Sequence, residues 1–319
     1  MTDIIFFFGQ QMLLCFVPLM IVALGGVFSE RSGVINFSLE GLMLGGAFAG
    51  AFFLRGTQDF LPGEVSYLLA LLVAGGAGVA VMMLHSYASI SLGGSQIISG
   101  MAVNLLLPAL TIVLARAIIG VLQVDYKNRF IVTAVPVLSN IPVIGPIFFK
   151  QAYISTLVGF IILIFTIIVF NKTRFGMRLH AVGENPEAAE SLGIKVAKTR
   201  YQATAISGFL AGVGGLAFIV PNASEYAASV AGYGYLAVAV VIFGQWQPIR
   251  IFGAAVFFGF MKTIASTYTI IPFFIDLGWS AYVYKMIPYV ATVIVLIFTS
   301  RKSKQPSALG IPYSHSEHV

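Results

Sequence analysis

Few residues in this chain could do chemistry, and most of them lie in one charged stretch, residues 172–200. No Gly-Lys-Ser or Gly-Lys-Thr occurs that could cradle a nucleotide phosphate. The sequence also lacks a nucleophile elbow, a zinc-binding helix motif and a clustered acid pair. Cys15 is the single cysteine, so we expect neither an intrachain disulfide nor a cysteine metal site. The composition therefore predicts a protein that is not an enzyme and that needs no cofactor in this chain.

Within the charged stretch, the residue order predicts a short helix over 186–192 with marked ends. Asn185 can cap its start, Pro186 suits the first helical position, and Gly193 can close it. Glu187 places an acid in the first turn, where the helix dipole favours negative charge. A helix of two turns is not stable alone, so it needs a partner in the cytoplasm. The alternative is a helix lying on the inner leaflet, which the lack of large apolar residues disfavours.

A second set of candidates consists of polar residues inside or beside apolar stretches. Glu40 stands at the start of such a stretch, where a charge needs a partner or water. Lys262 lies near the middle of another, where a charge costs about 2.5–3.5 kcal/mol on insertion scales. It must face the bundle interior, a partner subunit or water. Either a transport pathway or pairing between helices would explain it.

Further pathway candidates are ambiguous on sequence alone. Gln96 and Asn104 are spaced to share one helical face, so they could bind a neutral polar substrate or bridge two helices. The polar turn with Glu30 and Arg31 could simply balance its own charges. Tyr233 could anchor the chain at the membrane interface or face a vestibule that receives substrate. The remaining candidates, on the turn or in an outer loop, are Asn36, Asn222 and Glu225.

The elements that must position these residues are apolar segments. The chain is 58% hydrophobic and 9% charged, against about 25% charged in soluble domains. We therefore expect an all-α polytopic bundle with about nine membrane segments. Two of them are shorter than the roughly 20 residues needed to span, and glycine clusters suggest close helix contacts or broken helices. The segments cover 5–28, 39–54, 66–84, 89–115, 151–171, 201–220, 229–244, 250–272 and 281–299.

The distribution of Lys and Arg predicts the orientation. The net charge is +6, and the basic residues gather in the loop 172–200 and in the tail, which indicates the cytoplasmic side rather than nucleic-acid binding. The N-terminus is then outside, and the long outer link 116–150 forms an ordered cap. We expect one membrane domain, 1–300, and a polar tail, 301–319, that is disordered or loosely docked. His315 and His318 in this tail lack further converging ligands for a metal.

Five stretches of the sequence carry motifs that belong together. They are Glu30-Arg31-Ser32-Gly33-Val34-Ile35-Asn36 with Leu39-Glu40-Gly41, Ala231-Gly232-Tyr233-Gly234-Tyr235-Leu236-Ala237, Ile242-Phe243-Gly244-Gln245-Trp246-Gln247-Pro248, Gly183-Glu184-Asn185-Pro186-Glu187-Ala188-Ala189 with Gly193-Ile194, and Pro306-Ser307-Ala308-Leu309-Gly310-Ile311-Pro312-Tyr313. These motifs resemble permease subunits of ATP-binding-cassette (ABC) importers in the ribose and branched-chain amino acid permease superfamily, most closely the nucleoside (guanosine-type) uptake branch. The resemblance covers essentially the whole chain; Phe37-Ser38 departs from the Ile-Gly expected there.

This resemblance implies a role for the charged stretch. Its residues Gly183, Glu184, Asn185, Pro186, Glu187, Ala188, Ala189 and Gly193 would dock in a groove of a separate cytoplasmic ABC ATPase and transmit its closure. It also implies a second homologous permease, as a heterodimer, an extracytoplasmic substrate-binding lipoprotein, and a place in the bacterial cell membrane with the C-terminus cytoplasmic. A permease for simple sugars or branched-chain amino acids is one alternative. An ATP-independent secondary transporter or channel is another, although the apolar segments carry few acids to couple an ion.

Overall fold

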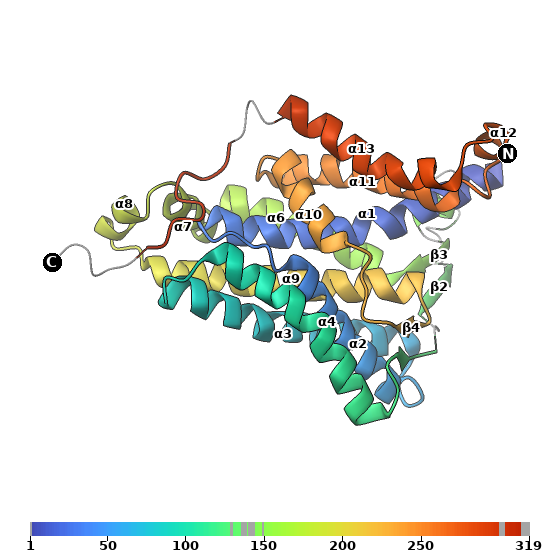
Figure 1. Cartoon of the computed structure of the whole chain (residues 1–319), viewed down its shortest axis with the longest axis horizontal. Coiled ribbons are helices and arrows are strands. Elements are labelled where there is room, and N and C mark those ends of the chain that lie inside the picture. Colours follow the sequence, from blue (N-terminus) through green and yellow to red (C-terminus); the bar gives the residue numbers. More distant parts are fainter. Residues whose placement is uncertain are drawn as a thin grey trace.

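Two long antiparallel helices, α1 (Thr2–Arg31) and α9 (Val196–Asn222), form the centre of a helical bundle (Figure 1). The computed structural model describes residues 2–127, 130–134, 139, 144–148, 150–299 and 304–313. Both central helices are buried along most of their length, which explains why their apolar residues run all round instead of following one stripe. Around them stand α2 (Leu39–Thr57), α3 (Gly63–Ser86), which continues into the π-turn η1 (Tyr87–Ser91), α4 (Gln96–Ile119), α6 (Ile154–Lys172), α11 (Pro248–Thr267) and α13 (Ala281–Thr299).

Glycines allow α9 to pack against its neighbours almost backbone to backbone. A Cβ atom on Gly212 would lie 2.2 Å from the carbonyl oxygen of Ala74 in α3. One on Gly215 would lie 2.1 Å from that of Met43 in α2. The expectation that glycine clusters mark close helix contacts is confirmed here. Small residues at such contacts are how membrane helices associate without a hydrophobic driving force.

Six of the described helices are long and apolar enough to cross a bilayer: Ile4–Arg31, Gly63–Ser91, Gln96–Ile119, Ile154–Lys172, Val196–Asn222 and Pro248–Thr267. The nine expected segments are therefore not confirmed as nine spans. The other three fall on α2, α13 and the short helix α10 (Tyr233–Phe243). With 11 residues, α10 reaches about 16 Å, roughly half the hydrocarbon thickness of a bilayer.

The helices α2 and α10 both begin inside the bundle. After α1 ends, the chain runs extended back along α9: Ser32 lies beside Arg200, whereas Asn36 bonds to Ser207, two turns further along α9. α2 starts from that depth. α10 starts beside α2 and runs in the opposite direction. Its residue Gly234 contacts Glu40 in the first turn of α2. Two discontinuous segments thus meet with their helix N-termini together.

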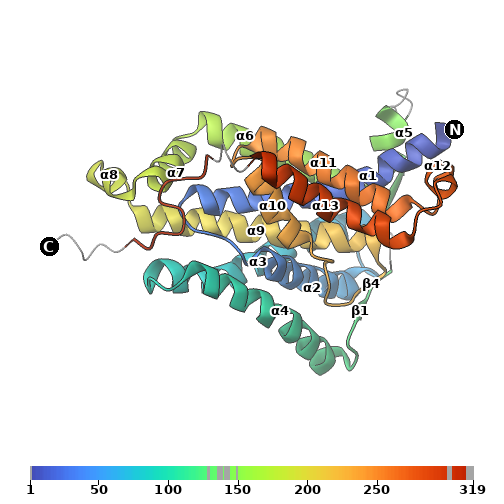
Figure 2. The same ribbon diagram turned by 45° about the horizontal axis from the view of Figure 1, so that its top comes forward.

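One end of the bundle carries a few short strands, while the described chain is mostly helical, as the sequence predicted. β1 (Val124–Asp125) pairs antiparallel with β4 (Glu225–Tyr226), and β2 (Ile131–Ala134) pairs with β3 (Lys150–Tyr153). The short helices α5 (Ile144–Phe148) and α12 (Pro272–Asp276) lie at the same end (Figure 2). The described parts of the predicted cap, residues 116–150, are ordered; Arg129, Pro136 and Pro142 lie outside the described residues.

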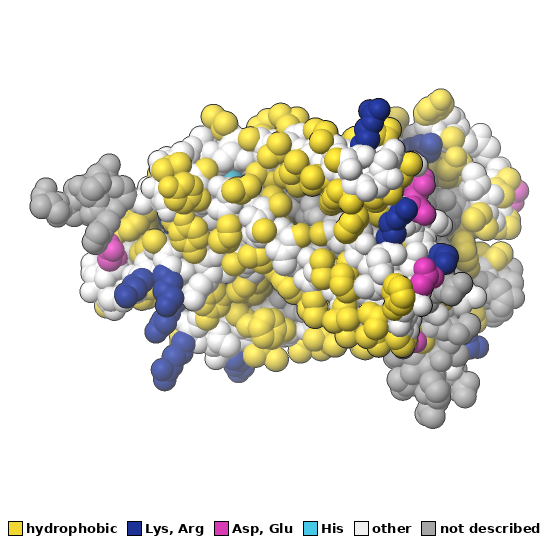
Figure 3. All heavy atoms as spheres, turned by 90° about the horizontal axis from the view of Figure 1, so that it is seen from below, with side chains coloured by type: hydrophobic (Ala, Val, Ile, Leu, Met, Phe, Trp, Pro, Cys, Tyr) yellow, Lys and Arg dark blue, Asp and Glu magenta, His cyan; other side chains and the backbone are white. Residues whose placement is uncertain are grey.

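The opposite end carries α7 (Arg174–Glu184), α8 (Pro186–Ser191) and residues 304–313. Figure 3 shows basic side chains gathered at this end, while basic and acidic side chains intermix at the strand-bearing end. The mixing includes the ion pairs Arg55–Asp125 and Lys127–Asp59. The positive-inside rule thus predicts that the α7–α8 end faces the cytoplasm. His315 and His318 lie outside the described residues.

Candidate coupling and pathway sites

The short helix expected at 186–192 is confirmed as α8, one residue shorter. The Asn185 side chain accepts a hydrogen bond from the backbone N–H of Ala188 at 3.0 Å, and Pro186 occupies the first turn. At the other end Gly193 adopts a φ of +81°, and Ile194 N–H donates to the Ala189 carbonyl at 3.0 Å. These are the cap and terminator that the residue types predict.

One side of α8 is open and the other is attached. Ala189 is buried in a small apolar cluster with Val182 and Val196. On the open side, Glu187, Ala188 and Ser191 are exposed, and Leu192 is 81% exposed. A short helix that presents its outer surface in this way can enter a groove on another protein.

The junction between α7 and α8 packs against the end of α1. A Cβ atom on Gly183 would lie 2.1 Å from the Arg31 carbonyl oxygen, so this close approach requires glycine. Glu184, the last residue of α7, places Oε1 3.8 Å from Nη1 of Arg31. Among the predicted coupling residues, Gly183 and Glu184 thus contact the end of α1, while Ala189 packs near Val196 at the start of α9.

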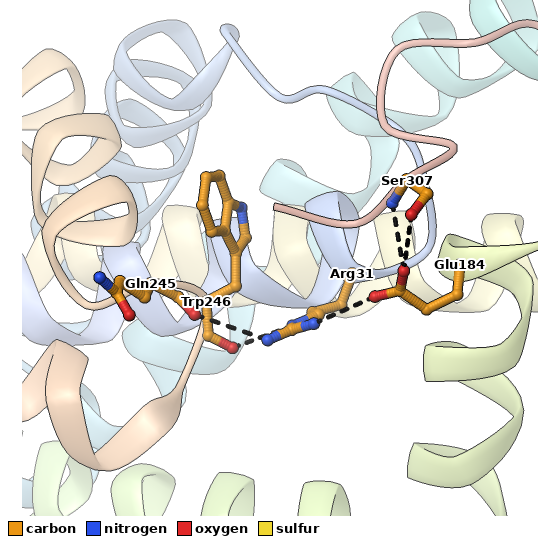
Figure 4. A network of polar contacts seen from close by, with 5 residues as sticks. All are labelled: Arg31, Glu184, Gln245, Trp246 and Ser307. Atoms are coloured by element: carbon orange, nitrogen blue, oxygen red, sulfur yellow. Dashed lines mark hydrogen bonds and ion pairs between the residues drawn. The ribbon is translucent and has the colours of Figure 1, made fainter. Parts of the chain in front are cut away.

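Arg31 links this junction to the turn between α10 and α11 (Figure 4). Its Nε donates to the carbonyl of Trp246 at 3.0 Å, and its Nη2 to that of Gln245 at 3.5 Å. Gln245 and Trp246 have φ values of +49° and +54°, a left-handed conformation that costs non-glycine residues energy. The Trp246 indole N–H donates to the Glu30 carboxylate. The tightly held turn is thus bound to the end of α1.

No local pattern in the sequence favoured this role for Glu30 and Arg31, whose charges could have balanced one another. In the structure they turn to different partners, Trp246 and Glu184. The one sequence signal for these contacts was that the stretches around Arg31, Glu184 and Trp246 all carry motifs of the same permease resemblance. Distances between them depend on tertiary packing.

Residues 304–313 belong to the tail that the sequence predicted to be disordered or loosely docked, and they pack against α7 and α8. Ser307 Oγ donates to Glu184 Oε2 at 2.9 Å, and the Tyr313 hydroxyl donates to Glu190. This hydrogen bond, aided by partial desolvation, raises the pKa of Tyr313 to about 12. Arg200, only 1% exposed, donates to the carbonyls of Ser32 and Ile311.

The pathway candidate Glu40 joins the two discontinuous segments. Its carboxylate accepts from the backbone N–H groups of Gly232 at 3.0 Å and Gly234 at 2.6 Å, at the start of α10. An acid there complements the positive end of a helix. A Cβ atom on Gly234 would lie 2.3 Å from the backbone nitrogen of Glu40, so the contact between the segments is close.

Three other candidates hold the extended segment before α2. Asn36 donates to Ser207 at 2.9 Å. Gln96 accepts from Ile35 N–H at 2.7 Å. Asn104 donates to the Phe37 carbonyl at 2.6 Å and accepts from Gly41 N–H at 2.7 Å. The two amides on α4 thus form the bridging bonds that one of the two sequence alternatives required, and they fix the start of α2.

Lys262, near the middle of α11, lies beside two aromatic rings from other helices. Its ammonium nitrogen is 5.3 Å from the Tyr233 ring centroid and 5.7 Å from that of Tyr289, so cation–π attraction offsets part of its desolvation. Tyr233 is buried, whereas Tyr289 on α13 is 62% exposed. Tyr233 and Lys262 were predicted separately as pathway candidates, without their contact, and Tyr289 was not among the candidates.

Two candidates remain apart from this group, at the strand-bearing end. Asn222 donates to the Phe218 carbonyl within its own helix at 2.7 Å. Glu225 is exposed in β4, opposite Asp125. Within the part of the chain that the structure describes, no group of three His, Cys, Asp or Glu residues could hold a metal ion.

Comparison with known proteins places this architecture in a family. Residues 10–296 match the family described as branched-chain amino acid transport system / permease component. The chain belongs to this family. Because the match covers nearly the whole chain, it includes the Arg31 junction, α8 and the discontinuous segments together.

Two relatives are similar to this chain over most of their length, and a third over about a third of it. The chain is 38% identical over 299 residues to the guanosine ABC transporter permease protein NupQ of Bacillus subtilis, covering 93% of this chain and 92% of NupQ. It is 37% identical over 308 residues to the nucleoside ABC transporter permease protein NupC of Lactococcus lactis, covering 96% of each. NupB of the same L. lactis strain, also a nucleoside ABC transporter permease, is 34% identical over 113 residues, covering 34% of this chain and 31% of NupB.

The fold is similar to that of a solved ABC transporter of metal-chelate type in an inward-facing conformation. The TM-score is 0.53 at 16% identity, covering 91% of this chain and 85% of that one. At this identity the likeness concerns the fold. It supports a helical ABC permease architecture for the described bundle.

Proposed function

We propose that this chain is a permease subunit of an ABC importer for nucleosides, forming half of a translocation path and coupling it to a separate ATPase. The observation that carries the proposal is the extensive identity to two nucleoside permeases, NupQ and NupC, along nearly the whole chain. The capped helix α8, whose exposed side points away from the bundle, supplies the rigid contact surface that such a subunit needs for its ATPase. Nothing in this role requires chemistry on the substrate.

The contacts suggest how ATPase closure would reach the path. Movement of α8 passes through Glu184 and Gly183 to Arg31, and from Arg31 to the turn at Trp246. That turn ends α10, whose other end rests on Glu40 of α2. A displacement at the cytoplasmic end would therefore shift both discontinuous segments, as alternating access requires. Packed helices transmit such shifts because interiors are dense.

We assign three partners to this subunit. A second, homologous permease would complete the path as a heterodimer; the similarity of the chain to both NupC and NupB of one organism supports two related permeases. A cytoplasmic ABC ATPase would bind α8, and an extracytoplasmic binding lipoprotein would deliver substrate to the strand-bearing end. The protein would lie in the bacterial cell membrane with its C-terminus cytoplasmic.

Transport of radiolabelled guanosine, ribose and leucine into proteoliposomes tests the substrate class. The vesicles would contain this chain with its neighbouring permease, ATPase and receptor. We expect ATP-dependent uptake of guanosine, with competition by other nucleosides but not by ribose or leucine. ATP-dependent uptake of ribose or leucine alone would overturn the nucleoside assignment and retain the importer. Uptake by this chain alone without ATP would instead indicate a secondary transporter or channel.

A further inference from the structure

Residues 304–313, here called the C-terminal strap, cross the end of the bundle between α7 and the loop after α1. The backbone N–H of Ala308 donates to the Gly183 carbonyl at 2.9 Å. Two residues later, Gly310 N–H donates to the Gly33 carbonyl at 3.0 Å. Ala308 is 5% exposed. The strap is thus bonded through its backbone to the α7–α8 junction on one side and to the end of α1 on the other.

Side chains extend these attachments to α8 and α9. Ser307 bonds to Glu184, and the Tyr313 hydroxyl bonds to Glu190 within α8. Arg200 of α9 donates to the Ile311 carbonyl at 3.5 Å, and its guanidinium carbon lies 5.9 Å from the Tyr313 ring centroid. The strap therefore touches α7 and α8 on one side and the ends of α1 and α9 on the other.

Without the strap, α8 would be poorly fixed. Asn185 separates it from α7 with φ −151° and ψ +97°, a break at which the two helices can pivot. The apolar cluster around Ala189 contains three fully buried residues, which is little area to resist a pull. The bond from the Tyr313 hydroxyl to the Glu190 carboxylate restrains α8 itself, and the bond from Ser307 to Glu184 holds the end of α7 just before the break. Both are hydroxyl-to-carboxylate bonds. They are also less sensitive to salt than pairs of full charges.

We propose that the C-terminal strap is a positioning element of the coupling machinery, tying α8 to the ends of α1 and α9 so that they move as one body. This inference rests on the proposed function, because it requires an ATPase that pulls on α8. Ser307 and Tyr313 act through Glu184 and Glu190, and neither needs to touch substrate or nucleotide.

The first test measures ATP hydrolysis and guanosine uptake in the same proteoliposomes, for the full-length chain and the variant Ser307→Ala/Tyr313→Phe. Phenylalanine keeps the ring over Arg200 and removes only the hydroxyl. We expect hydrolysis to stay within about twofold while uptake per ATP falls about tenfold, since losing hydrogen bonds to charged groups lets α8 shift. Gln305→Ala, an exposed strap position, is the matched control and should preserve the ratio.

A second arm links the strap to α8 covalently. Cysteines replace Tyr313 and Glu190 in a Cys15→Ser background, and a short bifunctional thiol reagent joins them. If the strap and α8 move together, linkage leaves uptake per ATP at or above that of the unlinked protein. Loss of uptake on linkage, restored by cleaving the reagent, would show that the strap must release and would overturn the inference. This arm decides the question should the double variant assemble poorly.

The two hypotheses fail differently. If the unmodified importer takes up no guanosine with ATP, the proposed function is wrong. If it does, and both Ser307→Ala/Tyr313→Phe and Tyr313→Phe alone keep the normal ratio of uptake to hydrolysis, the strap inference is wrong and the function stands.

Discussion

Arg31 and Glu184 place their charged groups 3.8 Å apart where the end of α1 meets the proposed coupling segment, which consists of α7 and α8. The Arg31 side chain is 9% exposed and that of Glu184 51%. A pair so long and half-solvated contributes at most about 1 kcal/mol by itself. Arg31 matters more because the same guanidinium holds the Trp246 turn. Arg31 joins the coupling segment to the turn between α10 and α11, and the ion pair with Glu184 orients the Arg31 guanidinium.

Arg31→Lys should therefore harm coupling more than Glu184→Gln. Lysine has no planar fork and cannot reach both the Trp246 carbonyl and Glu184, so we expect uptake per ATP to fall about tenfold, roughly 1.4 kcal/mol. Glutamine retains an oxygen that can accept from Ser307, and its effect should stay within about threefold. Initial uptake rates at matched ATP hydrolysis measure both. The reverse ranking would contradict the assigned role of Arg31.

Gly183→Ala tests the close approach of the coupling segment to α1. The new methyl would meet the Arg31 carbonyl oxygen at 2.1 Å, and such overpacking costs about 1–3 kcal/mol. We expect a lower thermal midpoint in detergent and reduced uptake. Gly76→Ala in α3 is the control, because a Cβ there meets nothing within 4 Å. An equal loss in both variants would show that the Gly183 contact is not specific.

Asn185→Ala removes the cap of α8 and costs about 0.5–2 kcal/mol of local stability. The Ala188 amide, which donates to Asn185 at 3.0 Å, should exchange its hydrogen about threefold to thirtyfold faster, as mass spectrometry can measure. Ser191→Ala should leave that amide unchanged. Unaltered exchange in Asn185→Ala would mean that partner contacts, not the cap, hold α8.

His180 predicts a pH dependence of the coupling segment. Burial, and next the positive charge of Arg31, lower the pKa of His180 from its usual 6.5. The unfolded chain thus binds more protons just below pH 6.5, so stability falls as pH drops through 6.5 towards the folded-state pKa. We expect the thermal midpoint of His180→Gln to vary less with pH than that of the unmodified protein between about pH 7.5 and 5.5. A steeper profile would contradict this sign.

Lys262→Met distinguishes a pathway charge from a structural one. Removing a charge from the middle of a membrane span relieves a cost of about 2.5–3.5 kcal/mol, so the thermal midpoint should hold or rise. If Lys262 and the exposed Tyr289 face the path, uptake should still fall at least about tenfold. Normal uptake with a lower midpoint would assign Lys262 to packing alone.

Short-range patterns in the sequence predicted much of this structure, but they did not predict its long-range contacts. Asn185, Pro186 and Gly193 act within a few residues, so their order alone predicted α8. The Arg31–Trp246 bond joins residues 215 positions apart and the Ser307–Glu184 bond residues 123 positions apart, so both depend on how the bundle packs. Hydropathy likewise located α10 without revealing that it starts beside Glu40, because apolar content does not report depth.

The most direct test of the central claim is ATP-dependent guanosine uptake by the reconstituted importer, with and without Glu187→Arg/Ala188→Arg on the open side of α8. We predict uptake that requires ATP in the unmodified complex and is abolished in the variant, while the two permeases still assemble. ATP-driven uptake that survives the variant, or uptake by this chain alone without ATP, would contradict the account.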